Sequence, residues 1–493
     1  MKNLKYLTLL VGLTLFSCEE DALDKPLLSN LTAGTFPESE SDAVLATNAI
    51  YNSLREWNIH TGGFPLLDIM SDQVTKGSNP GDGTAIAPYE NFTHTASEGS
   101  TERWYKTLYK AIRRANLVIT KVPEIEFTDD NLKIRLEAEA RFLRAFYYSK
   151  LVRGYGDVPL VLETDPPLDL GKTATEEIYD QVIFPDLQFA VDNLPEKSDY
   201  DTEDMGRATK GAAKSLLARL YLFLGDYTNA ETYAMEVINS DQYDLEDDFA
   251  DAFSEDNEFG VESVFEVGAL PLGFGQGGNQ YANTWAIRGT PNRGWGFGRP
   301  AYSWILMMQA NDDPRMDASV IFLGEVLDGV ETLGDASTPD TTRADGEIVE
   351  IEVYNQKVWH SGEGTQGSFG FNMRVIRYAD VLLMAAEALN ENDKTAQALT
   401  YLNQVRQRAR GGDNTILPDI TATDKATVRE AIANERNYEL AFEGLRFWDL
   451  VRTDRAEEVL GPLGFIPNKN ELFPIPQSEV DISEGRIGQN PGY

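Results

Sequence analysis

The chain has 493 residues, and 80 Asp and Glu against 43 Lys and Arg give it a formal net charge of −37. So acidic a chain repels phosphate backbones, which excludes nucleic-acid binding because that function needs a basic surface. A single cysteine excludes a disulfide framework, and three histidines are too few ligands for a structural zinc site. We expect no metal site and no cofactor, and we interpret the acids at Asp247, Asp248 and Asp251 as chance clustering rather than a calcium site.

The N-terminus has the pattern of a secretion signal. Lysines precede an apolar run from Leu7 to Phe16, which is too short to cross a membrane because a span needs about 20 apolar residues. We therefore predict that residues 1–17 are a signal peptide. The stretch Leu15-Phe16-Ser17-Cys18 resembles a bacterial lipobox, which predicts lipid attachment at Cys18 and a lipidated acidic tether over residues 18–30. The alternative, a free buried thiol, fits poorly with a cleavable leader.

The remainder, residues 31–493, is expected to form one domain that is mostly α-helical. Apolar residues recur at helical spacing near 98–154, 175–239, 378–410 and 424–461. The first of these stretches meets Gly154 and Gly156, which should end its helix. Small residues at facing positions and short breaks between the helices resemble tetratricopeptide units. We expect the helical scaffold to comprise about 31–239 and 378–493.

Residues 240–377 have a different texture and are predicted to be a large loop-rich insertion. Gly, Asp, Asn and Pro are frequent there, and short alternating stretches at Glu262–Val267 and Glu347–Val353 predict small strands. Residues 324–350 are acidic and low in apolar content, which favours a surface segment. A second irregular stretch covers His60 to Ser100. Irregular segments that project from a scaffold usually carry the binding residues.

Two carboxylates lie on an otherwise apolar helix face that includes Glu435 and Glu439. Buried carboxylates need partners, and guanidinium groups pair with them through two hydrogen bonds. We interpret the pair as structural, with candidate partners at Arg377, Arg436, Arg446 and Arg452. The alternative is a general acid and base, as in a glycosidase, but structural ion-pair networks commonly resemble such sites. We expect no catalytic residues.

Aromatic residues concentrate in one Gly-rich part of the insertion. Flat rings stack against the faces of sugar rings, while neighbouring amides and guanidiniums bond the hydroxyl groups. We predict a ligand-binding surface from these types of residue: Trp285, Trp295, Tyr281, Phe297, Arg288, Asn283 and Asn292. The alternative is that the rings pack the insertion onto the helices. Tyr302 and Trp304 favour that alternative, because they precede the apolar run Ile305–Met308.

Several blocks of sequence resemble the SusD/RagB family. They include Leu136–Val161 (LEAEARFLRAFYYSKLVRGYGDVPLV), Val375–Asn390 (VIRYADVLLMAAEALN) and Asn434–Arg452 (NERNYELAFEGLRFWDLVR), together with Ala208–Tyr227 and Phe473–Tyr493. The resemblance covers nearly all of the mature chain. It implies a SusD-like fold with tetratricopeptide-like helix pairs, held by lipid at the outer-membrane surface. The acidic run at residues 19–21 resembles a surface-export signal of such lipoproteins, with a plain solvated tether as the alternative.

The family resemblance also implies a partner and a ligand. The partner is a SusC-like TonB-dependent outer-membrane transporter, over which the lipoprotein acts as a lid. The ligand is most often an oligosaccharide, and Asp68 joins the candidate contacts because the family's pocket receives residues from that side, with Asp72, Tyr89 and Asn91. We predict a non-catalytic surface glycan-binding protein. A peptide-binding RagB-like protein and a secreted hydrolase with a carboxylate pair are the alternatives.

Overall fold

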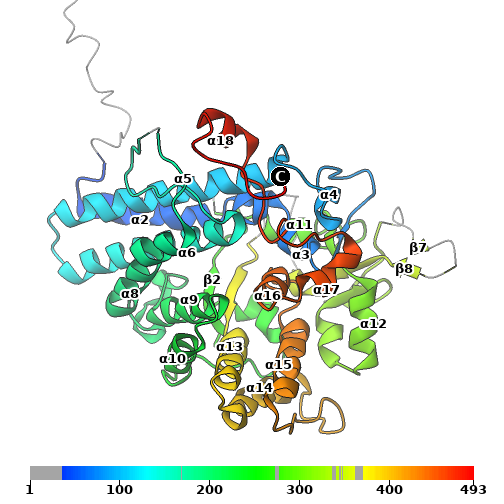
Figure 1. Ribbon diagram of the computed structural model, residues 1–493. Helices are drawn as coiled ribbons and strands as arrows, with labels where there is room; N and C mark the ends of the chain where they lie inside the picture. Colours follow the sequence, from blue (N-terminus) through cyan, green and yellow to red (C-terminus); the bar gives the residue numbers. More distant parts are fainter. Residues whose placement is uncertain are drawn as a thin grey trace, which may run out of the picture.

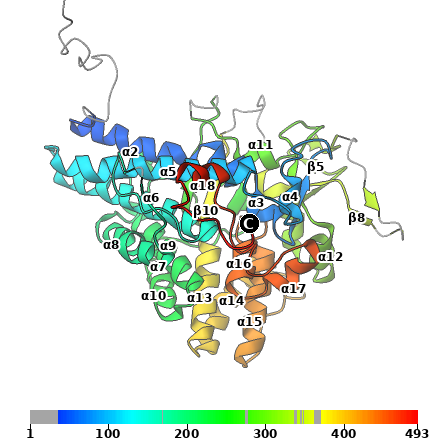
Figure 2. The ribbon, with the colours of Figure 1, turned by 45° about the horizontal axis from the view of Figure 1, so that its top comes forward.

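The computed structural model describes residues 36–167, 169–272, 277–335, 340–342, 346, 348–360 and 370–493. The predicted signal peptide, Cys18 and the acidic tether lie outside these residues. Figures 1 and 2 show a helical molecule in which α2 (Glu40–Leu54), α5 (Gly99–Lys121) and α6 (Asp130–Tyr155) cross one side. The helices α13 (Tyr378–Glu391), α14 (Thr395–Ala409) and α15 (Lys425–Glu439) are grouped at another.

Side-chain caps define where several of the long helices begin. Ser39 before α2 and Asp129 before α6 each accept a hydrogen bond from a backbone N–H of the first turn. Thr209 and Asp226 do the same for α9 (Lys210–Phe223) and α10 (Tyr227–Ile238). The predicted stop of α6 is confirmed, because the helix ends at Tyr155. The remaining helices are α3 (Leu66–Ile69), α4 (Ala87–Glu90), α7 (Thr175–Ile178), α8 (Phe184–Asn193), α11 (Tyr281–Trp285), α12 (Tyr302–Ala310), α16 (Arg446–Arg452), α17 (Ala456–Leu460) and α18 (Gln477–Ile482).

The predicted helix pairs are confirmed. Neighbouring helices pack against each other as α5 with α6, α9 with α10, and α13 with α14. Helix α10 also packs on α13, so the two parts of the scaffold that the insertion separates in sequence are joined in space. The stretch 424–461 differs from a simple pair, since α15 is followed by the short helices α16 and α17.

The insertion is loop-rich, as predicted, and its strands form two-stranded antiparallel sheets. The predicted strand at 262–267 is β2 (Ser263–Val267), which pairs with β10 (Met373–Arg377). The stretch predicted at 347–353 is divided between two strands, β8 (Ile348–Glu350) and β9 (Val353–Asn355), with residue 347 outside the described part. The other strands are β1 (Val74–Gly77), β3 (Phe297–Pro300), β4 (Val320–Phe322), β5 (Val326–Leu327), β6 (Val330–Glu331) and β7 (Thr341–Thr342).

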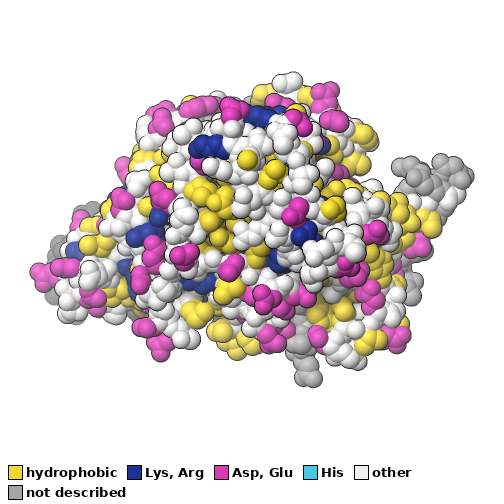
Figure 3. All heavy atoms as spheres, turned by 90° about the horizontal axis from the view of Figure 1, so that it is seen from below, with side chains coloured by type: hydrophobic (Ala, Val, Ile, Leu, Met, Phe, Trp, Pro, Cys, Tyr) yellow, Lys and Arg dark blue, Asp and Glu magenta, His cyan; other side chains and the backbone are white. Residues whose placement is uncertain are grey.

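One apolar core joins the scaffold and the insertion. It extends from Ala43 in α2 to Ile487 near the C-terminus, and it includes Trp285 and Trp304 of the insertion. No helix within the described ranges is long and apolar enough to cross a membrane. Figure 3 shows one face of the molecule, on which Asp and Glu side chains are widely spread while Lys and Arg gather in fewer places.

Candidate functional site

The two irregular segments expected to carry ligand contacts are joined by a pair of strands. Strand β1, from the segment after α2, runs antiparallel to β3 of the insertion, with Val74 opposite Pro300 and Gly77 opposite Phe297. The turn at residues 55–65 contacts α11 separately, through a hydrogen bond from Trp57 to Thr284. Side chains from both segments therefore share one surface.

Three half-buried rings on this surface form an aromatic cluster, which we define as Trp57, Phe64 and Trp295. The ring centroids of Trp57 and Phe64 are 5.1 Å apart, and those of Trp57 and Trp295 are 6.0 Å apart with the planes at 87°. Edge-to-face contacts of this kind are favoured by the charge distribution of aromatic rings. The Nε1–H of Trp57 donates to Oγ1 of Thr284 at 3.3 Å, which fixes the indole further.

Gly63 is required for the position of Trp57. Its φ is +98°, in the region that favours glycine, and a Cβ atom there would come within 2.5 Å of Cε2 of Trp57. The backbone thus passes directly against the indole. The indole of Trp57 contacts the backbone of Gly63 and the rings of Trp295 and Phe64. It is half-buried, so part of its surface remains accessible to a ligand.

Trp295 was predicted from the sequence as a ligand contact, whereas Trp57 and Phe64 were not. Both residues follow the end of α2, with Trp57 just before and Phe64 within the irregular stretch that begins at His60. Their position beside Asn58, Gly62 and Gly63 has the same composition that singled out Trp295. What the sequence does not contain is the strand pairing that brings residues 57–64 to residue 295.

Three of the predicted contact residues are buried, which corrects their placement on the ligand surface. Trp285 is 1% exposed, Asn283 is 0% exposed and Phe297 is 6% exposed. The indole of Trp285 packs against Gly298, where an added Cβ would lie 2.6 Å from the ring. The short helix α11 directs Asn283 and Trp285 into the core, and strand β3 does the same for Phe297, so the three side chains attach the insertion to the scaffold.

The other residues predicted from the insertion occupy different environments. Tyr281 is half-buried, while Asn292 is exposed in the loop after α11. Arg288 forms ion pairs with Asp82 and, at 2.6 Å, with Asp335. Its guanidinium therefore links the N-terminal segment to the insertion, and its first role is structural. Tyr281 and Asn292 remain proposed contacts.

Asp68 is not on the surface either, because it is 1% exposed. Its Oδ1 accepts a hydrogen bond of 2.8 Å from the backbone N–H of Gly444. Burial raises the pKa of Asp68 to about 7. The other residues proposed with it lie apart from the aromatic cluster: Asp72 pairs with Arg446 at 2.7 Å, Tyr89 is buried, and Asn91 is exposed.

A groove leads away from the aromatic cluster along α2, and we call it the α2 groove. Its first part is a cavity of about 310 Å³ lined by Asn52, Arg55, Met205 and other residues. A second cavity of about 370 Å³ shares Met205 and Arg207 with the first, so the two lie end to end. A narrow cleft lined by Arg55 and Trp57 connects the first cavity to the cluster. These volumes lie within the range of small-molecule sites.

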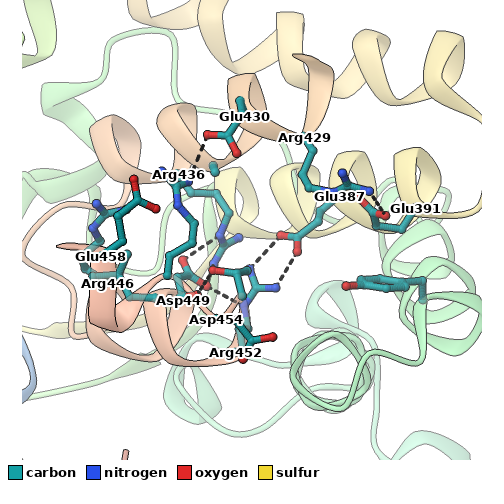
Figure 4. Close-up of a pocket in the computed structure, with 15 residues that line it drawn as sticks. Glu387, Glu391, Arg429, Glu430, Arg436, Arg446, Asp449, Arg452, Asp454 and Glu458 are labelled. Atoms are coloured by element: carbon teal, nitrogen blue, oxygen red, sulfur yellow. Dashed lines mark hydrogen bonds and ion pairs between the residues drawn. The ribbon is translucent and has the colours of Figure 1, made fainter. Parts of the chain in front are cut away.

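A larger cavity, of about 520 Å³, lies elsewhere, between α10, α13, α15 and α16. Figure 4 shows that its wall is charged, with Arg429 paired to Glu391 and Arg452 paired to Glu387. Tyr227 is the one ring among the described residues that line it. Because its arginines already have carboxylate partners and it lacks flat apolar surfaces, this cavity is a weaker candidate than the aromatic cluster.

Glu439 in α15 is completely buried and saturated with cations. It accepts hydrogen bonds from Arg315 and Arg377, both at 3.0 Å, and from Arg408 at 2.5 Å. Burial alone would raise the pKa of Glu439, but these guanidiniums hold it well below its usual range. A carboxylate that has no access to solvent and stays ionised cannot pass a proton to a substrate, so Glu439 does not act as a general acid.

The partners of the carboxylate pair differ in part from those expected. Glu435 pairs with Arg315 and Arg406, both at 2.7 Å, neither of which the sequence analysis named. Arg377 does contact Glu439. The other expected partners pair with different carboxylates. Arg446 and Arg452 lie on the short helix α16, and they pair with Asp72 and with Glu387 and Asp449, respectively. Arg436 lies in α15 itself and pairs with Asp380 and Asp449.

Two family models match the chain over separate stretches. One is described as the SusD family and matches residues 273–493. The other is described as starch-binding associating with the outer membrane and matches residues 25–222. Both models describe SusD-type proteins, and together they cover most of the chain, which supports its assignment to the SusD/RagB family. The second description also agrees with the predicted localisation at the outer membrane.

Similar proteins extend over nearly the whole length. The SusD-like protein P2 of Formosa agariphila is 29% identical, with 100% of each chain covered. A laminarin-binding SusD-like protein of known structure is 29% identical, with a TM-score of 0.76 and coverage of 92% of this chain and 100% of that chain. The surface glycan-binding protein A of Bacteroides thetaiotaomicron, solved with laminarihexaose, is 25% identical, with a TM-score of 0.74 and coverage of 92% and 99%. These similarities confirm the SusD-like fold.

Proposed function

We propose that the protein is a non-catalytic, surface-exposed lipoprotein that captures oligosaccharides and delivers them to a SusC-like TonB-dependent transporter. The observation that carries the proposal is the pair of half-buried indoles of Trp57 and Trp295, of which Trp57 lines the cleft at the end of the α2 groove. The similarity to proteins described as binding laminarin and laminarihexaose supports the same ligand class.

The chemistry of capture follows from the residues around the cluster. Part of each indole faces a ligand, and its apolar face suits the C–H groups of a pyranose ring. Arg55 lies next to Trp57 in the connecting cleft, with its guanidinium donating to Oδ1 of Asn52 at 2.7 Å. Arg55 and the exposed Asn52 are placed to bond sugar hydroxyls as the chain of the ligand continues into the groove. Binding of this kind breaks no covalent bond.

Isothermal titration with laminarihexaose and with maltohexaose tests the site. Trp57→Ala and Trp295→Ala should each weaken binding of the recognised oligosaccharide by about 10- to 30-fold, because a buried aromatic anchor contributes about 2 kcal/mol. Tyr233→Ala is the matched control, since this half-buried ring lies on α10 of the scaffold and should leave affinity unchanged.

Three outcomes would each contradict a part of the proposal. If both tryptophan variants bind the oligosaccharide as tightly as the parent protein, the aromatic cluster is not the site. If the parent protein binds extended peptides and no oligosaccharide, the ligand class is that of the peptide-binding alternative. Product formation from a polysaccharide by the purified protein would contradict the non-catalytic role.

The anchor and the transporter need separate experiments. We infer that Cys18 carries the lipid, so Cys18→Ala should move the protein from the outer-membrane fraction to a soluble fraction. The transporter should copurify with the lipidated parent protein in mild detergent. An unmodified Cys18 in the mature protein, measured by mass spectrometry, would contradict the anchor, and the recovery of the protein without any barrel partner would contradict the delivery step.

A further inference from the structure

A small interior cavity is lined by an unusual concentration of positive charge. Its volume is about 80 Å³, and it lies between α6, α9 and β10. Lys150 and Arg153 reach it from α6, Arg219 from α9 and Arg374 from β10. In a chain with a net charge of −37, four cations around one cavity require an explanation.

Lys150 has no carboxylate partner. No described residue forms an ion pair or a hydrogen bond with its Nζ, whose nearest recorded neighbour is the Phe146 ring, 4.9 Å from Nζ to the centroid. Burial, together with the charges of Arg153 and Arg219, lowers the pKa of Lys150 to about 7. The Lys150 side chain is half-buried, and an unpaired ammonium group that is partly removed from water is stabilised by a counter-ion.

The two arginines beside Lys150 have hydrogen-bond donors to spare. Arg153 donates from Nε to the carbonyl of Ser149 and stacks on Phe223, but one of its terminal nitrogens, Nη1, is buried without a partner. Arg219 is 5% exposed and pairs with Asp380 at 2.7 Å, yet its Nε is also buried without a partner. Unsatisfied buried donors around one cavity are the pattern that a bound acceptor would complete.

The two carboxyl groups of the cavity wall, Glu443 and Asp68, form no ion pair with Lys150. Glu443 pairs with Arg377 and Lys357. Asp68 receives the backbone N–H of Gly444 through one oxygen and forms no ion pair with any described residue. His60, the remaining titratable group that faces Lys150, is kept neutral because burial lowers its pKa to about 3. No carboxylate of the wall therefore compensates Lys150.

We propose that this cavity is a binding site for a small inorganic anion, held by Lys150 and by the unpartnered N–H groups of Arg153 and Arg219. The volume admits an ion of the size of chloride or a small oxyanion, and it is several times smaller than either cavity of the α2 groove. The cavity shares His60 and Tyr281 with the narrow cleft beside Trp57, but Lys150, Arg153 and Arg219 do not line that cleft. The existence of the anion site therefore does not depend on the proposed ligand.

Thermal unfolding at constant ionic strength tests the site. We expect the Tm of the parent protein at pH 6 to rise by about 1 to 3 °C when 200 mM glutamate, which is too large for the cavity, is replaced by chloride. Separate arms with phosphate and sulfate identify the preferred anion. At pH 9 the rise should shrink, because Lys150 must carry its proton to hold the anion.

Lys150→Met should abolish the anion-dependent rise. The matched control is Lys133→Met on the same helix, whose Nζ donates to the carbonyl of Ile125 away from the cavity, and which should keep the full rise. Bromide bound beside Lys150, located by anomalous diffraction from crystals of the parent protein, would support the site even if Lys150→Met fails to fold. An equal Tm in chloride, phosphate, sulfate and glutamate, or a cavity that holds only water in bromide-soaked crystals, would overturn the proposal.

Discussion

Asp68 is a carboxyl group that the fold removes from water without pairing it to a cation. It is 1% exposed, and burial raises its pKa from 3.8 to about 7. Between pH 3.8 and about pH 7, the carboxyl group of Asp68 is protonated in the folded state and ionised in the unfolded state. The free energy of unfolding contributed by Asp68 therefore falls as pH rises from about 4 to about 7, and it stays low above that range.

We predict that Asp68→Asn removes this loss. The difference in free energy of unfolding, variant minus parent, should be larger at pH 8 than at pH 4 by up to about 4 kcal/mol, because each pKa unit corresponds to about 1.4 kcal/mol. The variant therefore gains stability over the parent protein as the pH rises. Urea unfolding at both pH values measures the difference, and the exposed Asp256→Asn serves as the control. The account of Asp68 fails if its variant differs from the parent protein equally at both pH values.

At this scale the sequence predicted the kind of residue better than its position. Trp295 was identified from its glycine and arginine neighbours, and it does belong to the aromatic cluster. Trp285 has a similar neighbourhood and is buried, because the short helix α11 turns its side chain toward the core. Local composition cannot distinguish these two cases, since burial is decided by the partner segment that lies opposite.

The turn between α2 and α3 is the element on which the proposed site depends most. Gly63 lies in it with φ of +98°, and its missing side chain makes room for the ring of Trp57. We predict that Gly63→Ala displaces the indole and weakens oligosaccharide binding by about 10-fold or more, together with a loss of about 1 to 3 kcal/mol of stability from backbone strain.

Gly81→Ala is the matched control for this turn. Gly81 lies in the same irregular segment, and an added Cβ there would meet nothing within 4 Å. Calorimetric titration of both variants, with urea unfolding of each, separates loss of the site from loss of the fold. Unchanged affinity in Gly63→Ala would show that the position of Trp57 does not matter for binding.

The helices could be predicted as individual elements. The insertion could be predicted only as a loop-rich segment with short strands, without the pairing of those strands. The stripe through α6 and its stop at Gly156 follow from spacing and from glycine alone. The pairing of β1 with β3 joins residues more than 200 positions apart, and nothing in either strand specifies the other. The site is made by that pairing, which explains why Trp57 and Phe64 were missed.

Several arginines are buried in ion pairs, while many acidic side chains lie on the surface of the molecule. Arg315 and Arg377 are almost completely buried with their carboxylate partners, so these cations do not offset the acidic surface. The face in Figure 3 accordingly displays acidic side chains widely. Such a surface repels phosphates and acidic glycans but imposes no penalty on an uncharged oligosaccharide, which favours a neutral glucan as the first ligand to test.

A crystal structure of the protein with laminarihexaose tests the central claim most directly, because it locates the ligand without assuming a site. We predict sugar rings against Trp57 and Trp295, with the rest of the chain entering the α2 groove beside Arg55. An oligosaccharide bound in the charged cavity between α13 and α15, with the two indoles bare, would contradict the account.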